Sequence, residues 1–177
     1  MSIQVDLANT KSLHEAYWEF RLVSDSVPWS KRSPNMPSEI TEAIVCLCTS
    51  AVLIDSGHGD ILLPSGLIGE VKGTSSCNKD LSSFSPSSNF DALFFVHMGK
   101  GTNNIYLVYD LEMNRQEIMP IKVNNTATFE DHCRGNRRPR FSIINQIILP
   151  LNKKPRWKVD IESGIILDMK GNVSDSR

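Results

Sequence analysis

The chain has 177 residues, a formal net charge of −1 and an apolar share of 40%. A chain of this size is most simply one globular domain over residues 1–177. Its near-zero net charge excludes binding to nucleic acid by bulk charge alone. Any DNA-binding surface must therefore gather its basic residues on one side of the protein. The sequence contains no apolar run of the roughly 18 residues that a membrane helix needs, and its N-terminus lacks the pattern of a signal peptide.

The first predicted element is an amphipathic helix over residues 13–23. Its apolar residues recur at helical spacing and are expected to pack on the core. These residues are Leu13, Ala16, Tyr17, Phe20 and Val23. His14 is expected at the surface. The turn-rich segment 27–37 follows, in which Lys31 and Arg32 belong either to a plain linker or to a set of phosphate contacts.

A buried helix is predicted from Ser38, as N-cap after Pro37, to about Leu53. Glu39 and Glu42 lie at its start, where acids complement the helix dipole. Glu42 leads into the buried run, so it is the better candidate for a functional acid.

A turn over residues 55–59 contains His58, which is either an exposed loop residue or a general base. Two apolar segments joined by residues 64–66 then predict a hairpin over residues 60–72. Glu70 and Lys72 are two residues apart on its second strand, so they point to the same face, and the hairpin folds Asp60 back towards them. Buried charges persist only when they are paired or bind metal, which makes this trio the leading candidate site.

The hydroxyl-rich segment 73–91 has the composition of a linker, but its position directly after the hairpin favours an ordered loop near a phosphate-bearing substrate. Buried strands are predicted over residues 92–98 and 105–111, joined by a hairpin turn, and a short strand over residues 117–123 with Pro120 at an edge.

Four arginines fall within seven residues of an otherwise neutral chain, at positions 134, 137, 138 and 140. Arginine suits bidentate contacts to guanine and to phosphate, although an isolated basic cluster is also typical of a solvated loop. Residues 141–148 are predicted to form a buried helix or strand, with helix preferred, and strands are predicted at residues 157–161 and 165–167. The polar end from Lys170 is expected to fray.

The arrangement of Asp60, a spacer and Glu70-x-Lys72 resembles the PD-(D/E)XK nucleases, with Gly59 in place of the proline of that motif. The resemblance implies an α/β fold with a PD-(D/E)XK nuclease core, in which a mixed central β-sheet is flanked by helices. It also implies Mg²⁺-dependent phosphodiester hydrolysis, with Asp60, Glu70 and the Val71 carbonyl as metal ligands. Lys72 would contact the attacking water and the scissile phosphate, and Glu42 would assist from the preceding helix.

The chain also resembles the small Type II restriction endonucleases that recognise GC-any base-GC. The resemblance rests on the order of the segments 35–37, 59–60, 70–75, 80–86, 90–91 and 135–142. It implies a homodimer that cuts each strand of double-stranded DNA once, leaves 5′-phosphates and is paired with a DNA methyltransferase. The implied base or phosphate contacts are Arg134, Asn136, Arg137, Arg138 and Arg140. The residues expected to line the DNA beside the active site are Thr74, Ser75, Ser76, Lys79 and Ser82.

Two alternatives remain open from the sequence. One is a structure-selective nuclease such as a Holliday junction resolvase, which would share the Asp60, Glu70 and Lys72 core. The other is a non-catalytic DNA-binding module that uses the arginine loop alone. The four cysteines fit no standard zinc spacing and are expected to be reduced thiols, so the expected location is the cytoplasm of a prokaryote.

Overall fold

The computed structural model describes residues 2–55, 57 and 59–171. His58, the candidate general base of the 55–59 turn, lies outside the described residues. A mixed sheet of eight strands forms the centre, in the order β1-β2-β3-β4-β6-β7-β9-β10. The strands are β1 (Ser2–Ile3), β2 (Val52–Ile54), β3 (Ile61–Leu62), β4 (Ile68–Thr74), β6 (Ala92–Met98), β7 (Ile105–Asp110), β9 (Trp157–Asp160) and β10 (Ile165–Asp168). Strands β4 and β6 are parallel, and the other neighbouring pairs are antiparallel.

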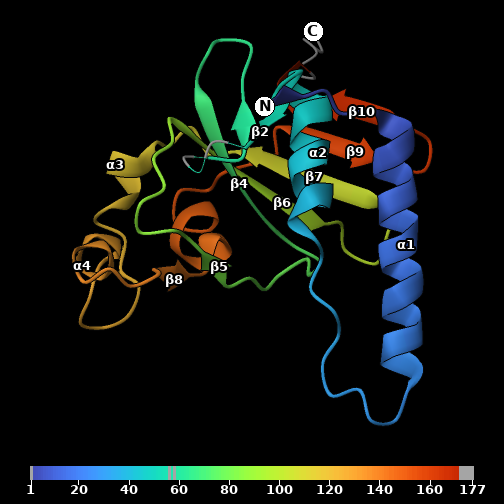
Figure 1. Cartoon of the computed structure of the whole chain (residues 1–177), viewed down its shortest axis with the longest axis horizontal. Coiled ribbons are helices and arrows are strands. Elements are labelled where there is room, and N and C mark those ends of the chain that lie inside the picture. The colour runs from blue at the N-terminus through green and yellow to red at the C-terminus, as the bar shows by residue number, and fades with distance from the viewer. Residues whose placement is uncertain (1, 56, 58, 172–177) are drawn as a thin grey trace, which may run out of the picture.

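Helices cover both faces of this sheet (Figure 1). Helices α1 (Leu7–Ser26) and α2 (Ser38–Thr49) contribute to the core on one face, with Phe94 and Val96 of β6. The other face is covered by α3 (Arg115–Ile118), α4 (Phe129–Arg134) and the π-helix η1 (Ile144–Ile148). Leu93 and Phe95 point into this second core because neighbouring side chains of a strand alternate between faces. The predicted mixed sheet flanked by helices is confirmed.

A small second sheet pairs two strands of two residues each, β5 (Ser82–Ser83) and β8 (Arg140–Phe141). Asp80 fastens this ribbon: its carboxylate accepts hydrogen bonds from the Ser142 hydroxyl (2.6 Å) and from the backbone amides of Ile143 (2.7 Å) and Ile144 (3.2 Å). The ribbon therefore holds two segments together that are far apart in the sequence. Among the helices of the described chain, none is long and apolar enough to cross a membrane.

Helix α1 is longer than predicted, and of the five residues predicted to pack on the core only Tyr17 is buried. It begins at Leu7, where the Asp6 side chain caps the amide of Asn9 (2.8 Å). Its buried residues are Thr10, His14 and Tyr17, whereas the predicted apolar face is largely exposed. The prediction of a surface His14 is wrong, because its Nδ1 lies 2.7 Å from the Tyr106 hydroxyl and this contact satisfies a buried polar ring.

Helix α2 ends at Thr49, four residues before the predicted end, because Ser50 adopts a left-handed conformation (φ 59°). The next residues turn into β2. Ser38 is the first helical residue and not the N-cap: Pro37 occupies the cap position, and no side chain caps the helix.

The predicted strand over residues 117–123 is wrong, because α3 ends at Ile118 and residues 119–123 form a turn with a single bridge from Lys122 to Thr128. Asn114 and Glu117 form a reciprocal capping box, which favours a helical turn over an extended segment. The 60–72 hairpin, the strands at 92–98, 105–111, 157–161 and 165–167, and a helix within residues 141–148 are confirmed.

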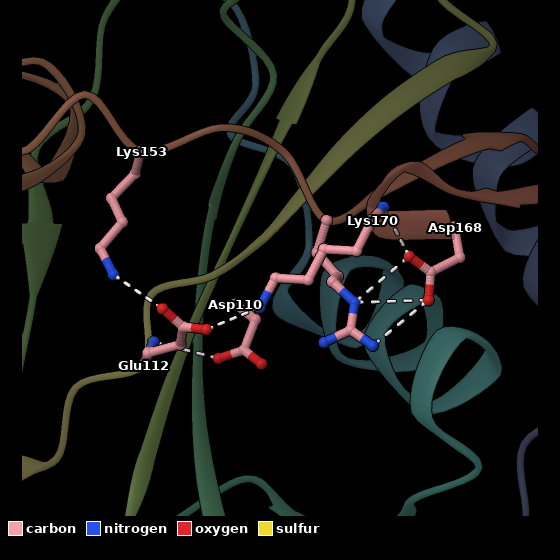
Figure 2. A network of polar contacts seen from close by, with 6 residues as sticks. Asp110, Glu112, Lys153, Asp168 and Lys170 are labelled. Atoms are coloured by element: carbon pink, nitrogen blue, oxygen red, sulfur yellow. Dashed lines mark hydrogen bonds and ion pairs between the residues drawn. The ribbon is translucent and has the colours of Figure 1, made fainter. Parts of the chain in front are cut away.

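Surface ion pairs connect the C-terminal segment to Glu112, which follows β7, and connect the segment before β9 to β10 (Figure 2). Glu112 accepts hydrogen bonds from Lys170 (2.6 Å) and Lys153 (3.1 Å), which together lower its pKa to about 2. Arg156 pairs with Asp168 on β10 at 3.2 Å. Lys170, where the sequence predicts a frayed end, is therefore in contact with the body of the protein, and residues 172–177 lie outside the described residues.

Candidate active site

The hairpin brings Asp60, Glu70 and Lys72 together. Asp60 directly precedes β3, and its Oδ2 accepts a hydrogen bond from the backbone amide of Val71 (2.7 Å). The Asp60 amide in turn donates to the Gly69 carbonyl (2.9 Å), so that Asp60 is fixed against β4. Lys72 Nζ lies 2.6 Å from Glu70 Oε1 and 3.9 Å from Asp60 Oδ2. An ammonium group thus lies within ion-pair distance of both carboxylates, in the grouping that the strand pattern predicts.

The electrostatics of this cluster are those of a cation site. Glu70 is only 5% exposed, and burial together with the charge of Glu70 raises the pKa of Asp60. The charge of Lys72 and the Val71 amide act in the opposite direction. Lys72 Nζ also lies 5.3 Å from the centre of the Phe84 ring, a favourable distance for a cation over an aromatic face. A buried and a partly buried carboxylate with one cation beside them attract further positive charge.

Ser88 is a site residue that the sequence reasoning missed. Its hydroxyl is buried and donates to Glu70 Oε2 at 2.7 Å, so each oxygen of Glu70 has a partner. Ser88 lies in the loop between Phe84 and Phe90, whose rings stack and belong to the core. One serine in a serine-rich loop gives no periodic signal, so its partner is visible only in the fold.

Glu42 reaches the same site from α2. It lines a pocket of about 280 Å³ together with Asp60, Lys72 and Ser82. Burial, and next the charge of Asp60, raise the pKa of Glu42 to about 7. Helix α2 can pack closely on β4 because residue 73 is glycine: a Cβ there would lie 2.4 Å from the Thr41 side chain. The sequence-based preference for Glu42 fits this geometry, whereas Glu39 is exposed on the same helix.

The raised pKa of Glu42 predicts a pH-dependent stability. Its ordinary value is 4.5, and in the folded protein it is about 7, so between these values the folded state holds a proton that the unfolded state has released. Stability is therefore highest below about pH 4.5 with respect to this group, falls as pH rises to 7, and stays reduced above it. Glu42→Gln should remove the slope and stabilise the protein at pH 8 by about 1 kcal/mol, a discounted figure because the side chain is partly exposed.

The measurement for Glu42 is the urea midpoint of both proteins at pH 5 and pH 8. The difference between wild type and Glu42→Gln should be larger at pH 8 than at pH 5. An equal difference at both values would contradict the assignment of this titration to Glu42.

One of the four clustered arginines, Arg138, lines a pocket of the hairpin site, and Arg140 lines a neighbouring pocket. Arg138 lines a pocket of about 240 Å³ together with Asp60, Glu70 and Lys72. Arg140 lines an adjoining pocket of about 640 Å³. Its other polar lining residues include Arg32, Asn35, Thr74, Ser75 and Ser83. The β5–β8 pairing places them there, because Ser83 is the register partner of Arg140.

The remaining predicted DNA contacts lie further from the carboxylates. Arg134 pairs with Glu130 on α4 at 2.6 Å, and Asn136 and Arg137 are exposed in the turn after that helix. Lys79 is exposed, and its carbonyl accepts a hydrogen bond from Thr74. Ser76 lines a separate shallow hollow that also includes Ser75, Trp18 and Arg21.

The donor set suits a small hard cation. Asp60 and Glu70 offer carboxylate oxygens, although among the described residues no group of three or more histidine, cysteine or acidic side chains is placed to hold a metal ion. Mg²⁺ is characteristically held by one or two carboxylates and keeps several of its waters, which this open pair of acids would allow. The adjoining arginine-lined pockets can accept phosphate oxygens.

Comparison with known proteins places these residues in a family. A family model described as Bsp6I restriction endonuclease matches residues 5–150, which include the hairpin, α2 and the arginine cluster. The Type II restriction enzyme Bsp6I of Bacillus sp. (strain RFL6) is 31% identical over 169 residues, which cover 94% of this chain and 97% of that protein. The chain therefore belongs to the Bsp6I restriction endonuclease family and is a Type II site-specific deoxyribonuclease.

Proposed function

We propose that Asp60, Glu70, Lys72 and Glu42 form the active site, and that the enzyme is a Mg²⁺-dependent, single-domain PD-(D/E)XK nuclease. It acts as a homodimer on double-stranded DNA, with GC-any base-GC as the proposed recognition sequence and 5′-phosphates as products. The observation that supports this proposal most directly is the position of Lys72 Nζ, within 2.6 Å of Glu70 and 3.9 Å of Asp60. Two acids that can hold a metal ion and a lysine that can stabilise developing charge suit phosphodiester hydrolysis.

The residues have separate tasks in this proposal. Asp60, Glu70 and the Val71 carbonyl hold Mg²⁺, which when bound neutralises phosphoryl charge and makes a water more nucleophilic. Lys72 donates hydrogen bonds from Nζ to the attacking water and to a phosphate oxygen, and so stabilises the charge that develops there. Burial and the charge of Asp60 raise the pKa of Glu42 to about 7. At neutral pH the Glu42 carboxylate can therefore accept a proton from the attacking water.

DNA binding is assigned to the pockets beside the acids. Arg138 and Arg140 make the innermost contacts, with Thr74, Ser75 and Ser82 beside the scissile strand. Arg134, Asn136, Arg137, Ser76 and Lys79 make outer contacts. A bacterial enzyme that cuts a short sequence would damage its own genome, so we propose a partner DNA methyltransferase and a cytoplasmic location.

The test is a digest of unmethylated phage DNA by the purified protein, with Mg²⁺ and with EDTA, analysed on a gel. Discrete fragments that require Mg²⁺ are expected, and sequencing of their ends gives the site, the cut position and the 5′-phosphate. A smear would contradict sequence specificity under these conditions. Intact linear DNA together with cleaved four-way junctions would favour the junction resolvase, and binding without cleavage of either substrate would favour the DNA-binding module.

Ser88 should tune the metal site. Ser88→Ala removes the hydroxyl that holds Glu70 Oε2 at 2.7 Å, so Glu70 loses one of its two fixed contacts. A group that orients a metal ligand typically contributes about 10–100-fold to metal affinity. The Mg²⁺ concentration for half-maximal cleavage is expected to rise by at least 10-fold, and calorimetric Mn²⁺ binding to weaken in parallel.

The matched control is Ser87→Ala, a change at the exposed neighbouring serine, which should leave both values unchanged. Unchanged Mn²⁺ affinity in Ser88→Ala would contradict the positioning role even if the rate fell.

A further inference from the structure

Helix α1 presents an apolar face to solvent. Phe20 is 62% exposed, Val23 58% and Leu13 39%. Together with the exposed Ala16 they form the α1 stripe, defined here as Leu13, Ala16, Phe20 and Val23. The stripe residues follow one another at spacings of three, four and three, which places them along one side of the helix. Trp29, in the connector after the helix, is 79% exposed.

The helix has too little intramolecular support for its length. Of its 20 residues, Thr10, His14 and Tyr17 are buried, and in the described chain none after Tyr17 is. Figure 1 shows the C-terminal half of α1 and the connector extending away from the sheet. Protein helices owe most of their stability to the packing of an apolar face. A further packing partner would supply the missing support.

We propose that the α1 stripe is the dimer interface and that its occupant is α1 of a second copy of this chain. The spacing is that of the a and d positions through which helices pair. If the two helices run antiparallel about a two-fold axis, Leu13 lies opposite the partner's Val23, and Ala16 opposite the partner's Phe20. The smallest residue of the stripe then faces the largest, and the two copies make identical contacts, as a two-fold interface requires.

Exposed aromatic side chains on α1 and in the connector after it are available to anchor such an interface. Phe20 and Trp29 are aromatic residues that bury about 150–250 Å² each when they are covered. Buried aromatic anchors of this kind dominate interfaces whose standard size is about 800 Å² per partner. The polar residues that border the stripe, such as Ser12 and Glu19, would form the rim.

Charge argues against DNA as the occupant of α1. The helix has two basic and three acidic residues, and both basic residues already pair within it. Lys11 lies 3.9 Å from Glu15, and Arg21 lies 3.7 Å from Asp25. The remaining acid is Glu19, which would repel phosphate groups.

The position of α1 suits a dimer that acts on one duplex. The connector over residues 27–37 leads from α1 to α2 and carries Arg32, Asn35 and Met36 into the pocket of Arg140. Pairing at α1 would therefore place the DNA-facing pockets of both copies on either side of one axis. This inference rests on the proposed function, because a two-fold symmetric recognition sequence is matched by a two-fold symmetric enzyme.

The test is sedimentation equilibrium of the full chain with Phe20→Asp. A buried pair of aspartates at this position should raise the dimer dissociation constant at least 100-fold. The far-ultraviolet circular dichroism spectrum should not change, because Phe20 is exposed in the single chain. The matched control is Leu167→Asp on the edge strand β10, which is 45% exposed and should leave the dimer intact. If Phe20→Asp does not fold, Ala16→Arg tests the same face, since Ala16 is also exposed.

The possible results distinguish failure of the α1 interface from failure of the proposed homodimer and active site. A Phe20→Asp protein that remains a dimer overturns the α1 interface while the homodimer stands, and dissociation of Leu167→Asp instead would place the interface at β10. A wild type that is monomeric both alone and on a duplex with Ca²⁺ overturns the homodimer itself. Mg²⁺-dependent cutting by that monomer would leave the proposed active site in place.

Discussion

Glu70→Gln is expected to abolish DNA cleavage and to leave the fold intact. Glutamine keeps the volume of the buried side chain and can still accept a hydrogen bond from Ser88, so little packing is lost. What it removes is the negative charge that faces Lys72 at 2.6 Å and would hold the metal. A metal ion supplies several kcal/mol of transition-state stabilisation, so a loss of at least about 1,000-fold in rate is expected.

Asp60→Ala and Lys72→Ala should lose cleavage as severely, for different reasons. Asp60→Ala removes the second carboxylate, and Lys72→Ala removes the cation that compensates both acids. Without Lys72, the two buried carboxylates repel each other, and the already raised pKa of Asp60 should rise further. Each variant should still bind duplex DNA, because Arg138 and Arg140 are retained beside the altered residues.

The measurements are plasmid cleavage in Mg²⁺, DNA binding in Ca²⁺ and thermal unfolding. Glu39→Gln is the control, since it removes an exposed acid from the same helix as Glu42 and should cut normally. Robust cutting by Glu70→Gln or by Glu70→Ala, at any Mg²⁺ concentration, would remove Glu70 from the active site.

Local patterns were sufficient to predict the 60–72 hairpin and the strands β6, β7, β9 and β10, but not β1 or β2. The positions of Glu70 and Lys72 follow from the two-residue period of a strand, and a tight turn leaves few places for Asp60. The long apolar runs of β6 and β7 likewise admit little besides buried strands. These features depend on neighbours within about a dozen residues, which is the range over which sequence patterns are informative.

Other features depend on contacts between distant segments. Periodicity finds an apolar face on α1 but does not say what covers it, and the sheet is covered instead by the row that contains His14 and Tyr17. The Ser88 hydroxyl meets Glu70 across 18 residues, and two-residue strands such as β5 and β8 are too short to give a pattern. Residues 117–123 are predicted as a short strand, but the capping box at Asn114 starts the helical turn α3, and the chain turns at Met119 and Pro120 after it.

The arginines of the 134–140 segment are expected to differ sharply in importance, in an order that the sequence does not give. Arg140→Ala and Arg138→Ala should weaken DNA binding strongly, because both side chains line the pockets beside the acids. Arg134→Ala should have a small effect, because its guanidinium pairs with Glu130 at 2.6 Å on the exposed surface of α4. The loss expected for a bidentate contact to a guanine is about 1–3 kcal/mol, or roughly 5–150-fold in affinity.

Fluorescence anisotropy at several salt concentrations, in Ca²⁺ so that the duplex stays intact, separates the two roles of arginine. An arginine that contacts phosphate should lower the affinity for all sequences alike and reduce the salt slope by about one. An arginine that contacts a base should leave that slope nearly unchanged and relax discrimination at one position of the site. Arg138 lies beside Glu70 and Lys72, where the scissile phosphate is expected, so it should follow the first pattern, and Arg140 in the wider pocket should follow the second. A loss for Arg134→Ala equal to that for Arg140→Ala would mean that the DNA crosses α4, and not the pocket between β8 and the connector.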